Sequence, residues 1–362
     1  MLASTGYLLT MFGACVITFV FNAGSRADKI EIANHKWHIA GANGTRNGID
    51  IGVCYGLLGN DLPPATEVVS LFKSNGIQKM RLFNPNPDAL QALRGSQIQV
   101  TVGVANEDLP ALANSREAAN SWFTTNVKPY LNDIEFSYIA VGNEALPGQF
   151  GPNIGPAMHN LKDVLLENNL HGIQVTTVIS TVVLGTSYPP SASAFSEESA
   201  SGMTYVLKFL SDYGAPIMVN VYPYFAYAAE PENVRLDYAQ FTAEGAVVQD
   251  GSLSYSNLFD ATVDAFIWSM EKVGFPNVDV AIGESGWPSA GNGRFTTPDL
   301  ARTYNQNFMN HVIQSRGTPK RPNKYMDAHI FAMFNENLKP AGTEQNYGLF
   351  YPNKTPVYPI FS

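Results

Sequence analysis

The chain has 362 residues, of which 45% are hydrophobic and 15% are charged. This length is more than one sandwich or helical bundle needs, and it suits a single α/β barrel with a sizeable core. With 22 basic against 31 acidic residues, a net charge of −9 and no run of Lys or Arg, the composition argues against a nucleic-acid-binding surface.

The first residues are typical of a secretory leader. Residues 8–21 (LLTMFGACVITFVF) form an apolar run that is too short for a membrane span. The small residues Ala23, Ser25 and Ala27 follow it, and we expect cleavage after Ser25 or Ala27. The lead MLASTGY lacks the usual Lys or Arg, so a retained anchor is the alternative. A signal peptide over residues 1–27 predicts a secreted protein of the extracellular space or cell wall, with no membrane span once the signal is removed.

A polar extension with little apolar periodicity follows over residues 28–49 and ends in GANGTRNG. The remainder, residues 50–362, is expected to form one catalytic domain. Asn43 and Asn353 each begin an Asn-X-Thr sequon and are predicted glycosylation sites, although Pro356 weakens the second.

The cysteines and histidines predict neither a disulfide nor a metal site. Of the two cysteines, Cys15 leaves with the signal, so Cys54 has no partner within the mature chain. The only closely spaced histidines, His35 and His38, lie in the polar extension and are expected to be solvated.

From residue 50 onward, short runs rich in Val, Ile and aromatic residues alternate with longer stretches of helical spacing. We predict strands in eight runs: Ile49–Tyr55, Gln78–Phe83, Ile98–Ala105, Glu135–Glu144, Ile173–Ile179, Pro216–Tyr224, Val278–Glu284 and Asp327–Phe334. We predict helices at Ala65–Ser74, Ser115–Asn126, Gly155–Asn168, Met203–Tyr213, Ser256–Val273 and Pro298–Gln314. Asn257 or Ser256 is placed to cap one of these helices. Thr297 is placed to cap another, whose first residue is a proline.

The strand runs are continuously apolar rather than alternating, which indicates burial on both faces, as in a parallel sheet covered by helices. Eight strand–helix units predict a (β/α)₈ TIM barrel as a single domain. The alternative is an open doubly wound sheet, but no GxGxxG follows the first strand. The long connection from Phe225 to Tyr255, after the sixth strand, is expected on the active-site face.

Two predicted strands end in a carboxylate. The fourth finishes IAVGNE, which places Glu144 at its tip behind Asn143, and the seventh finishes VAIGES, which places Glu284 at its tip. Strands four and seven of an eight-stranded ring face each other across its mouth, where catalytic groups of barrels stand. Two carboxylates that flank a cleft are the machinery of glycoside hydrolysis. The alternative is that each glutamate only caps a helix or joins a salt bridge.

A third polar cluster follows the eighth strand in FAMFNENLKPAGTEQNYGLF. It brings Glu336, Lys339 and Glu344 to the same face of the predicted barrel. A lysine there would keep a neighbouring carboxylate ionised, because an opposite charge favours the charged form. The alternative is that these are ordinary surface charges.

Aromatic residues make up 12% of the chain and several fall at predicted strand ends. Sugar rings present apolar C–H faces that pack on aromatic rings, so such residues are candidates to line a saccharide groove, although most aromatic residues belong to cores. The candidates are Tyr55, Phe83, Tyr222, Tyr224, Phe225, Trp287 and Phe334.

Taken together and in this order, the segments IGVCYG, VGNE, NVYPYFAY, GESGWPS and FNEN…K…E…NYGLF resemble glycoside hydrolase family 17, the plant β-1,3-glucanases, over roughly residues 50–361. The resemblance implies that Glu144 is the general acid/base and that Glu284 is the nucleophile. It also implies an auxiliary role for the cluster after the eighth strand and a contact between Asn143 and the sugar 2-hydroxyl.

The chain departs from this pattern in two places. Phe83 stands in RLFNPN where members commonly have Tyr, which removes a hydroxyl near the catalytic face and with it one expected substrate hydrogen bond. The extension over residues 28–49 is also longer than the usual lead into the first strand. The C-terminal YPIFS carries neither a vacuolar propeptide, a lipid-anchor signal nor a carbohydrate-binding module, which makes secretion the expectation.

The sequence therefore predicts a secreted endo-1,3-β-glucanase that acts on laminarin, callose or fungal wall glucan with retention of configuration, in plant defence or wall remodelling. A polysaccharide is the expected partner of a monomer that uses no cofactor and no metal. One alternative is a 1,3-1,4-β-glucan endohydrolase on the same scaffold, and the other is a glucan-binding wall protein without turnover.

Overall fold

The structure is a computed structural model that describes residues 49–361. The expectations for a signal peptide, for the extension up to residue 48 and for glycosylation of Asn43 concern residues outside this range. Within residues 49–361, no helix is both long and apolar enough to cross a membrane.

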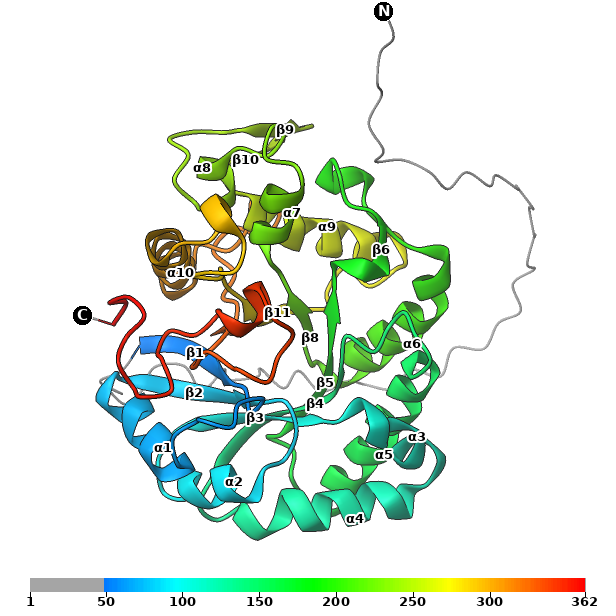
Figure 1. Ribbon diagram of the computed structural model, residues 1–362. Helices are drawn as coiled ribbons and strands as arrows, with labels where there is room; N and C mark the ends of the chain where they lie inside the picture. The colour runs from blue at the N-terminus through cyan, green and yellow to red at the C-terminus, as the bar shows by residue number, and fades with distance from the viewer. Residues whose placement is uncertain (1–48, 362) are drawn as a thin grey trace, which may run out of the picture. The chain divides into compact units, whose positions relative to one another are not determined.

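Eight parallel strands close into a barrel in the order β1-β12-β11-β8-β5-β4-β3-β2 (Figure 1). Their bounds are β1 Ile49–Tyr55, β2 Ile77–Leu82, β3 Gln99–Val104, β4 Glu135–Asn143, β5 Gln174–Ser180, β8 Ile217–Asn220, β11 Val280–Ser285 and β12 Ala328–Ile330. Each of the eight predicted runs overlaps one of these strands. The predicted TIM barrel is confirmed, and the doubly wound sheet is wrong.

The six predicted helices are confirmed and surround the barrel (Figure 1). They are α1 Ala65–Ser74, α4 Arg116–Asn126, α5 Gly151–Glu167, α6 Glu197–Tyr213, α9 Leu258–Lys272 and α10 Pro298–Ile313. The side chain of Asn257, rather than Ser256, caps α9 by accepting a 2.7 Å hydrogen bond from the backbone N–H of Asp260. Thr297 caps α10 in the same way, with a 3.2 Å bond from Leu300.

Four shorter helices were not predicted from the hydrophobic periodicity: α2 Pro87–Leu93, α3 Leu109–Asn114, α7 Pro223–Ala229 and α8 Leu236–Ala239. Helices of this length complete too few turns to establish an amphipathic pattern. Short 3₁₀ turns occupy Asn106–Asp108, Lys128–Tyr130, Thr181–Val183, Pro190–Ala192, Gly293–Phe295 and Thr343–Gln345.

Two strands are shorter than the sequence predicted. The sixth run was expected to reach Tyr224, but β8 ends at Asn220 and a helix begins at Pro223. Proline has no N–H for a strand ladder, and it suits the first turn of a helix. The eighth run was expected to reach Phe334, but β12 ends at Ile330. Beyond it, Phe331 and Met333 still donate to the carbonyls of Ser285 and Cys54 on the neighbouring strands, and the same segment also bonds to residues 347–350.

The long connection lies where it was expected and has structure of its own. It contains α7, α8 and an antiparallel pair, β9 Val248–Asp250 and β10 Leu253–Tyr255. A second antiparallel pair, β6 Leu184–Thr186 and β7 Ala194–Phe195, follows β5. Asp250 ties the two excursions together, because its carboxylate accepts hydrogen bonds from the backbone N–H and the hydroxyl of Ser191 at 2.7 and 2.5 Å.

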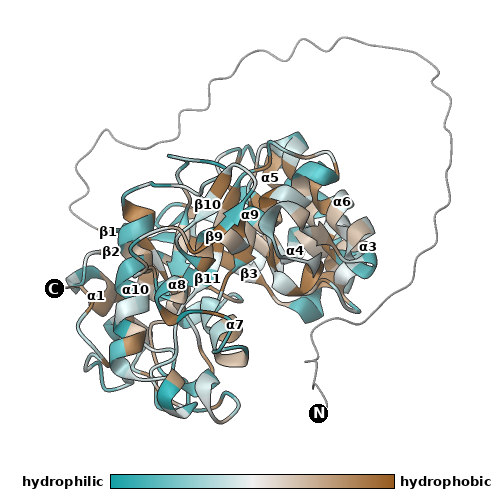
Figure 2. Ribbon diagram, turned by 90° about the horizontal axis from the view of Figure 1, so that it is seen from above, coloured by the Kyte–Doolittle hydropathy of each residue, from teal (hydrophilic) through white to brown (hydrophobic). Residues whose placement is uncertain are grey.

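Apolar side chains of the strands and the surrounding helices form one large buried cluster. The ribbon coloured by hydropathy shows hydrophobic stretches in both strands and helices (Figure 2). Several buried residues of the barrel strands are nevertheless polar, among them Lys79, Arg81, Thr101, Asn220 and His329. A buried polar group is costly unless it is hydrogen-bonded. The partners of these residues therefore direct attention to the carboxyl ends of the strands.

Candidate active site

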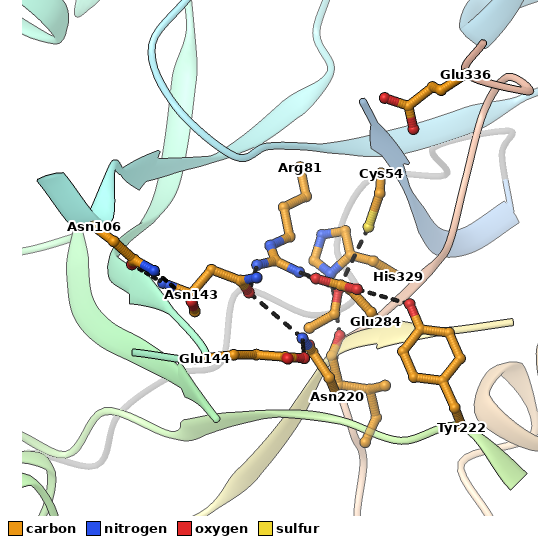
Figure 3. Close-up of polar contacts among 12 residues, drawn as sticks. Cys54, Arg81, Asn106, Asn143, Glu144, Asn220, Tyr222, Glu284, His329 and Glu336 are labelled. Carbon is orange, nitrogen blue, oxygen red and sulfur yellow. Dashed lines mark hydrogen bonds and ion pairs between the residues drawn. The ribbon is translucent and has the colours of Figure 1, made fainter. Parts of the chain in front are cut away.

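Glu144 and Glu284 stand at the carboxyl ends of β4 and β11 and approach each other across the barrel mouth (Figure 3). Strands β8 and β5 separate them in the ring. Glu144 adopts the left-handed region with φ of 50°, directly after the last residue of β4. A non-glycine residue in this region is uncommon, and here it aims the carboxylate at the mouth. The two predicted carboxylates are thus brought together.

Both oxygens of the Glu284 carboxylate accept strong hydrogen bonds. Arg81 on β2 donates from Nη1 to Oε1 at 2.8 Å, and the hydroxyl of Tyr222 donates to Oε2 at 2.7 Å. Burial, and then the negative charge of Glu284, raise the pKa of Tyr222 well above its ordinary value, so the phenol keeps the proton that it donates. A guanidinium and a phenol therefore stabilise Glu284 as an anion with a fixed orientation.

Glu144 has the opposite surroundings. The residue is exposed at the mouth, but loss of hydration around its carboxyl group, and then the negative charge of Glu284, raise its pKa. The Nδ2 group of Asn220, which donates to Oε1 at 2.6 Å, offsets part of this rise. Two nearby carboxyl groups in such different environments can act as a proton donor and an anion at the same pH.

Asn143 connects the two carboxylates. Its Oδ1 accepts from Arg81 Nη2 at 2.7 Å and from Asn220 Nδ2 at 3.4 Å. Its backbone N–H and C=O each form a 2.9 Å hydrogen bond with the side-chain amide of Asn106. The side-chain carbonyl of Asn143 is thus occupied, and the hydrogen bonds orient its amide N–H group for a ligand.

Sequence reasoning missed Arg81, Asn220 and Asn106. Arg81 and Asn220 did leave a signal, because each is a polar residue inside an otherwise apolar run whose side chain must find a partner when buried. Asn106 left none, since it lies in a short 3₁₀ turn after β3 and acts only through the backbone of Asn143.

The auxiliary cluster after β12 is assembled as expected. Lys339 Nζ lies 3.6 Å from Glu336 and 4.0 Å from Glu344, and 4.2 Å from the centre of the Phe331 ring. Glu336 is 3% exposed and accepts a 2.8 Å hydrogen bond from the backbone N–H of Leu58. Glu336 therefore attaches the loop after β1 to the loop after β12.

The aromatic candidates divide into two groups. Four of them are 4% exposed or less: Tyr55, Tyr224, Trp287 and Phe334. Their rings pack against other rings of the core, and Trp287 also donates from Nε1 to the carbonyl of Phe295 at 3.0 Å. A ring buried to this extent has no free face for a sugar, so the expectation that these four line a groove is corrected by their burial.

Phe83, Tyr222 and Phe225 remain at the catalytic face. Phe83 and Tyr222 are half-buried, and Phe225 is 49% exposed. The ring of Phe83 packs against the guanidinium of Arg81 at 4.5 Å, and the rings of Tyr222 and Phe225 lie 5.6 Å apart. These three are the aromatic residues that can meet a substrate beside Glu284.

Asn353 lies in an exposed turn, where its Oδ1 accepts from the backbone N–H and the hydroxyl of Thr355 at 3.0 and 2.6 Å. Glycosylation there stays a prediction. Among residues 49–361, no group of three or more His, Cys, Asp or Glu side chains is arranged to hold a metal ion.

Comparison with known proteins agrees with this geometry. The chain is 48% identical to a probable glucan endo-1,3-beta-glucosidase of Arabidopsis thaliana, over 100% of both chains, so residues 1–48 have a counterpart there. It is 50% identical to Lichenase-2 of Hordeum vulgare over 86% of this chain and 97% of that one. A solved plant beta-glucan endohydrolase, one of two with distinct substrate specificities, superposes with a TM-score of 0.83 at 50% identity, covering 86% of this chain and 100% of that one. Residues 51–361 match Glycosyl hydrolases family 17, and the chain belongs to this family.

Proposed function

We propose that this glycosidase hydrolyses 1,3-β-glucosidic linkages within β-glucan chains, with retention of configuration at the anomeric carbon. The observation that carries the proposal is the contrast between the two carboxyl groups: Arg81 and Tyr222 both donate hydrogen bonds to Glu284, whereas burial and the charge of Glu284 raise the pKa of Glu144. A retaining glycosidase needs one carboxylate nucleophile and one carboxylic acid.

In the first step, an oxygen of Glu284 attacks the anomeric carbon while the bond from that carbon to the leaving oxygen breaks. Glu144 transfers its proton to that oxygen, so the shortened glucan departs as an alcohol. Asn143 is placed to donate from Nδ2 to the sugar 2-hydroxyl, because its Oδ1 is engaged by Arg81. Phe83, Tyr222 and Phe225 offer ring surface to the sugars on either side of the bond that breaks.

In the second step, Glu144 acts as a base. Glu284 is now an ester without charge, so one of the two causes that raise the pKa of Glu144 is removed. The Glu144 carboxylate takes a proton from water, and the water oxygen attacks the anomeric carbon. The ester bond breaks, and Glu284 returns to its carboxylate form between Arg81 and Tyr222.

The test is hydrolysis of laminarin by the full-length secreted protein, with reducing ends assayed and the anomers followed by NMR. The proposal requires oligosaccharide products early in the reaction and a β-anomer as the first product. An α-anomer formed first would mean inversion and would reassign the two carboxylates. Binding to laminarin without any hydrolysis would favour the glucan-binding wall protein.

A second candidate is the hydrolysis of mixed-linkage 1,3-1,4-β-glucan. The observation that favours it is the 50% identity to Lichenase-2, which is as high as the 48% identity to the 1,3-beta-glucosidase relative. The same assay decides between the two when kcat/KM on laminarin is compared with kcat/KM on mixed-linkage glucan. A ratio above one supports 1,3-β-glucan as the main substrate.

We also propose that residues 1–27 direct secretion and are removed, that residues 28–49 precede the catalytic domain of residues 50–362, and that the protein acts in the cell wall as a monomer. The apolar run at residues 8–21 and the small residues after it support secretion. N-terminal sequencing of the protein recovered from culture medium, with its mass before and after deglycosylation, tests the cleavage and the use of Asn43 and Asn353.

A further inference from the structure

Strand β11 contains one residue more than its neighbours immediately before Glu284. On β8, Val219 and Asn220 are consecutive, but their partners Ile282 and Glu284 on β11 are separated by Gly283. A shift of one residue between β11 and β12 falls at the same place. An extra residue of this kind is a β-bulge, which bends the strand and changes the direction of the following side chain. The bulge therefore decides where the Glu284 carboxylate points.

Side chains from three other strands bind the two carbonyl groups of this bulge (Figure 3). Arg81 of β2 donates from Nη1 to the Gly283 carbonyl at 3.0 Å, and the Cys54 thiol of β1 approaches the same oxygen at 3.5 Å. His329 of β12 bonds through Nδ1 to the Ile282 carbonyl at 3.3 Å. Arg81 also binds the Glu284 carboxylate, whereas Cys54 and His329 bond only to the backbone of the bulge.

His329 is a neutral hydrogen-bond donor, and the absence of a side chain at Gly52 leaves room for its ring. A carbonyl oxygen only accepts, so Nδ1 must carry the proton. Burial lowers the pKa of His329 to about 4, with Asp327 acting against this and the cations Arg81 and Lys79 adding to it. Gly52 on β1 lies beside the ring, where a Cβ atom would come 2.2 Å from the imidazole Cδ2. Only glycine at this position leaves room for the histidine.

We propose that His329 is a positioning residue of the nucleophile: it holds the β11 bulge through the Ile282 carbonyl and so sets the Glu284 carboxylate against its donors Arg81 and Tyr222. The inference rests on the proposed function, in which Glu284 attacks the sugar. Cys54 gives the next carbonyl a second and weaker hold, since a thiol is a poor donor. A reacting group displaced by about 1 Å loses on the order of 10²-fold in rate, so a small relaxation of the bulge is measurable.

Two substitutions separate the hydrogen bond of His329 from the volume that its ring fills, because leucine keeps most of the volume and asparagine keeps the donor. His329→Leu removes the donor, and His329→Asn keeps an N–H group at the place of Nδ1. We expect His329→Leu to lower kcat on laminarin about tenfold or more with KM within about twofold. His329→Asn is expected to recover most of the loss. Wild-type kinetics in a folded His329→Leu variant, or equal losses in both variants, would overturn the proposal.

A measurement without substrate distinguishes failure of the positioning role from failure of the proposed function. Crystal structures of the free proteins give the distances from the Glu284 carboxylate to Arg81 Nη1 and to the Tyr222 hydroxyl, which are 2.8 and 2.7 Å here, and we expect them to lengthen in His329→Leu but not in His329→Asn. No hydrolysis by the wild type would reject the proposed function alone, and unchanged distances in His329→Leu would reject the positioning role alone.

The matched control is His311→Leu. This half-buried histidine lies on α10, with Nε2 2.9 Å from Asp260, and within residues 49–361 it forms no hydrogen bond or ring contact with the bulge. We expect it to lose thermal stability with unchanged kcat and unchanged distances from Glu284 to Arg81 and Tyr222. If His329→Leu does not fold, Cys54→Ala takes its place. We expect Cys54→Ala to lower kcat by a smaller factor and Cys54→Ser to restore it. Equal activity of the wild type, Cys54→Ala and Cys54→Ser would count against the proposal.

Discussion

Strand β2 carries two buried cations, Lys79 and Arg81, and their partners lie at opposite ends of the barrel. Lys79, 9% exposed, binds Asp50 at 2.5 Å and Asp327 at 2.8 Å, both at the amino ends of strands. Arg81, 1% exposed, binds the carboxylate of Glu284 at 2.8 Å, at the carboxyl end. Each cation is buried and each is paired with a carboxylate, but only the partner of Arg81 must react.

The two pairs differ in what surrounds the carboxylate. Asp50 lies near the start of β1, and Asp327 immediately precedes β12. These are the first and the last barrel strands in the sequence and are neighbours in the ring, so Lys79 links the first strand to the last. Glu284 lies on a bulge that its neighbours hold by hydrogen bonds, and it faces a second carboxyl group. In barrels of this type the amino-terminal face contributes stability and the carboxyl-terminal face carries chemistry. Substitutions at the two ends should therefore separate stability from rate.

The largest effect is expected for Glu284→Gln. A neutral amide cannot form the glycosyl-enzyme ester, so we expect no turnover on laminarin or on activated aryl glucosides. The substitution also leaves the Arg81 cation buried without its anion, which lowers stability. Activity on both substrates is measured with a highly purified variant. Any turnover that survives active-site titration would remove Glu284 from the role of nucleophile.

Glu144→Gln should divide substrates by their leaving group. Loss of the acid stops cleavage of laminarin, but a dinitrophenyl leaving group needs no proton, so the glycosylation step on such a glucoside is expected to remain fast. The raised pKa of Glu144 means that the wild type loses its acid only at a pH above the ordinary carboxyl range. The basic limb of kcat/KM on the aryl glucoside should therefore disappear in the variant. Equal losses on both substrates would show that Glu144 is not the acid.

Arg81→Lys tests the carboxyl-terminal end of the comparison directly. Lysine keeps the charge but cannot bind Glu284, the Gly283 carbonyl and Asn143 together, because it lacks the planar fork of arginine. We expect kcat/KM on laminarin to fall about 10²-fold, comparable with the removal of one preorganised donor. Thermal unfolding should change little. A variant with wild-type rates would assign Arg81 a purely structural role.

Lys79→Met tests the amino-terminal end. It leaves the largely buried Asp327 without its cation, and the free energy of unfolding is expected to fall by about 3 kcal/mol, while kcat of the folded protein stays unchanged. Asp50, whose side chain is 53% exposed, contributes little to this cost. The double variant Lys79→Met/Asp327→Asn should recover part of the stability, because no unpaired charge remains. A large fall in kcat would contradict the division between the two ends.

The same comparison shows what the sequence could predict. Glu144 and Glu284 could be selected as candidates because each lies at the end of a buried strand, which is a local property of the chain. Their partners were not selected, since Arg81 and Glu284 are separated by 203 positions and meet only when the barrel closes. The same holds for Lys79 and Asp327.

The prediction that Tyr55, Tyr224, Trp287 and Phe334 line a groove was wrong for a related reason. Trp287 stands at a strand end like the two glutamates, but the rings of Tyr224 and Tyr227, from the connection after β8, cover it. Burial at the mouth of a barrel depends on the path of such connections, which periodicity does not predict. The strand runs themselves were predicted well, because burial on both faces leaves a continuous apolar pattern.

The smallest effect concerns Phe83, where the chain departs from the family pattern. A tyrosine hydroxyl that met the substrate or Glu284 would contribute about 0.5–1.5 kcal/mol, or roughly threefold to tenfold in rate. The structure favours a smaller gain, because Arg81 and Tyr222 already bind both oxygens of Glu284 and the Phe83 ring packs against the Arg81 guanidinium.

We therefore expect Phe83→Tyr to raise kcat/KM on laminarin less than about threefold, with Phe83→Leu as the matched control for the loss of the ring. The leucine variant should be the more damaging of the two, since it removes the aromatic face that orients the Arg81 guanidinium above the nucleophile. A gain of several-fold in Phe83→Tyr, with unchanged thermal unfolding, would mean that the added hydroxyl reaches the transition state. The contact between Phe83 and Arg81 would then be incidental to catalysis, and the missing hydroxyl would be a specific loss of activity in this chain.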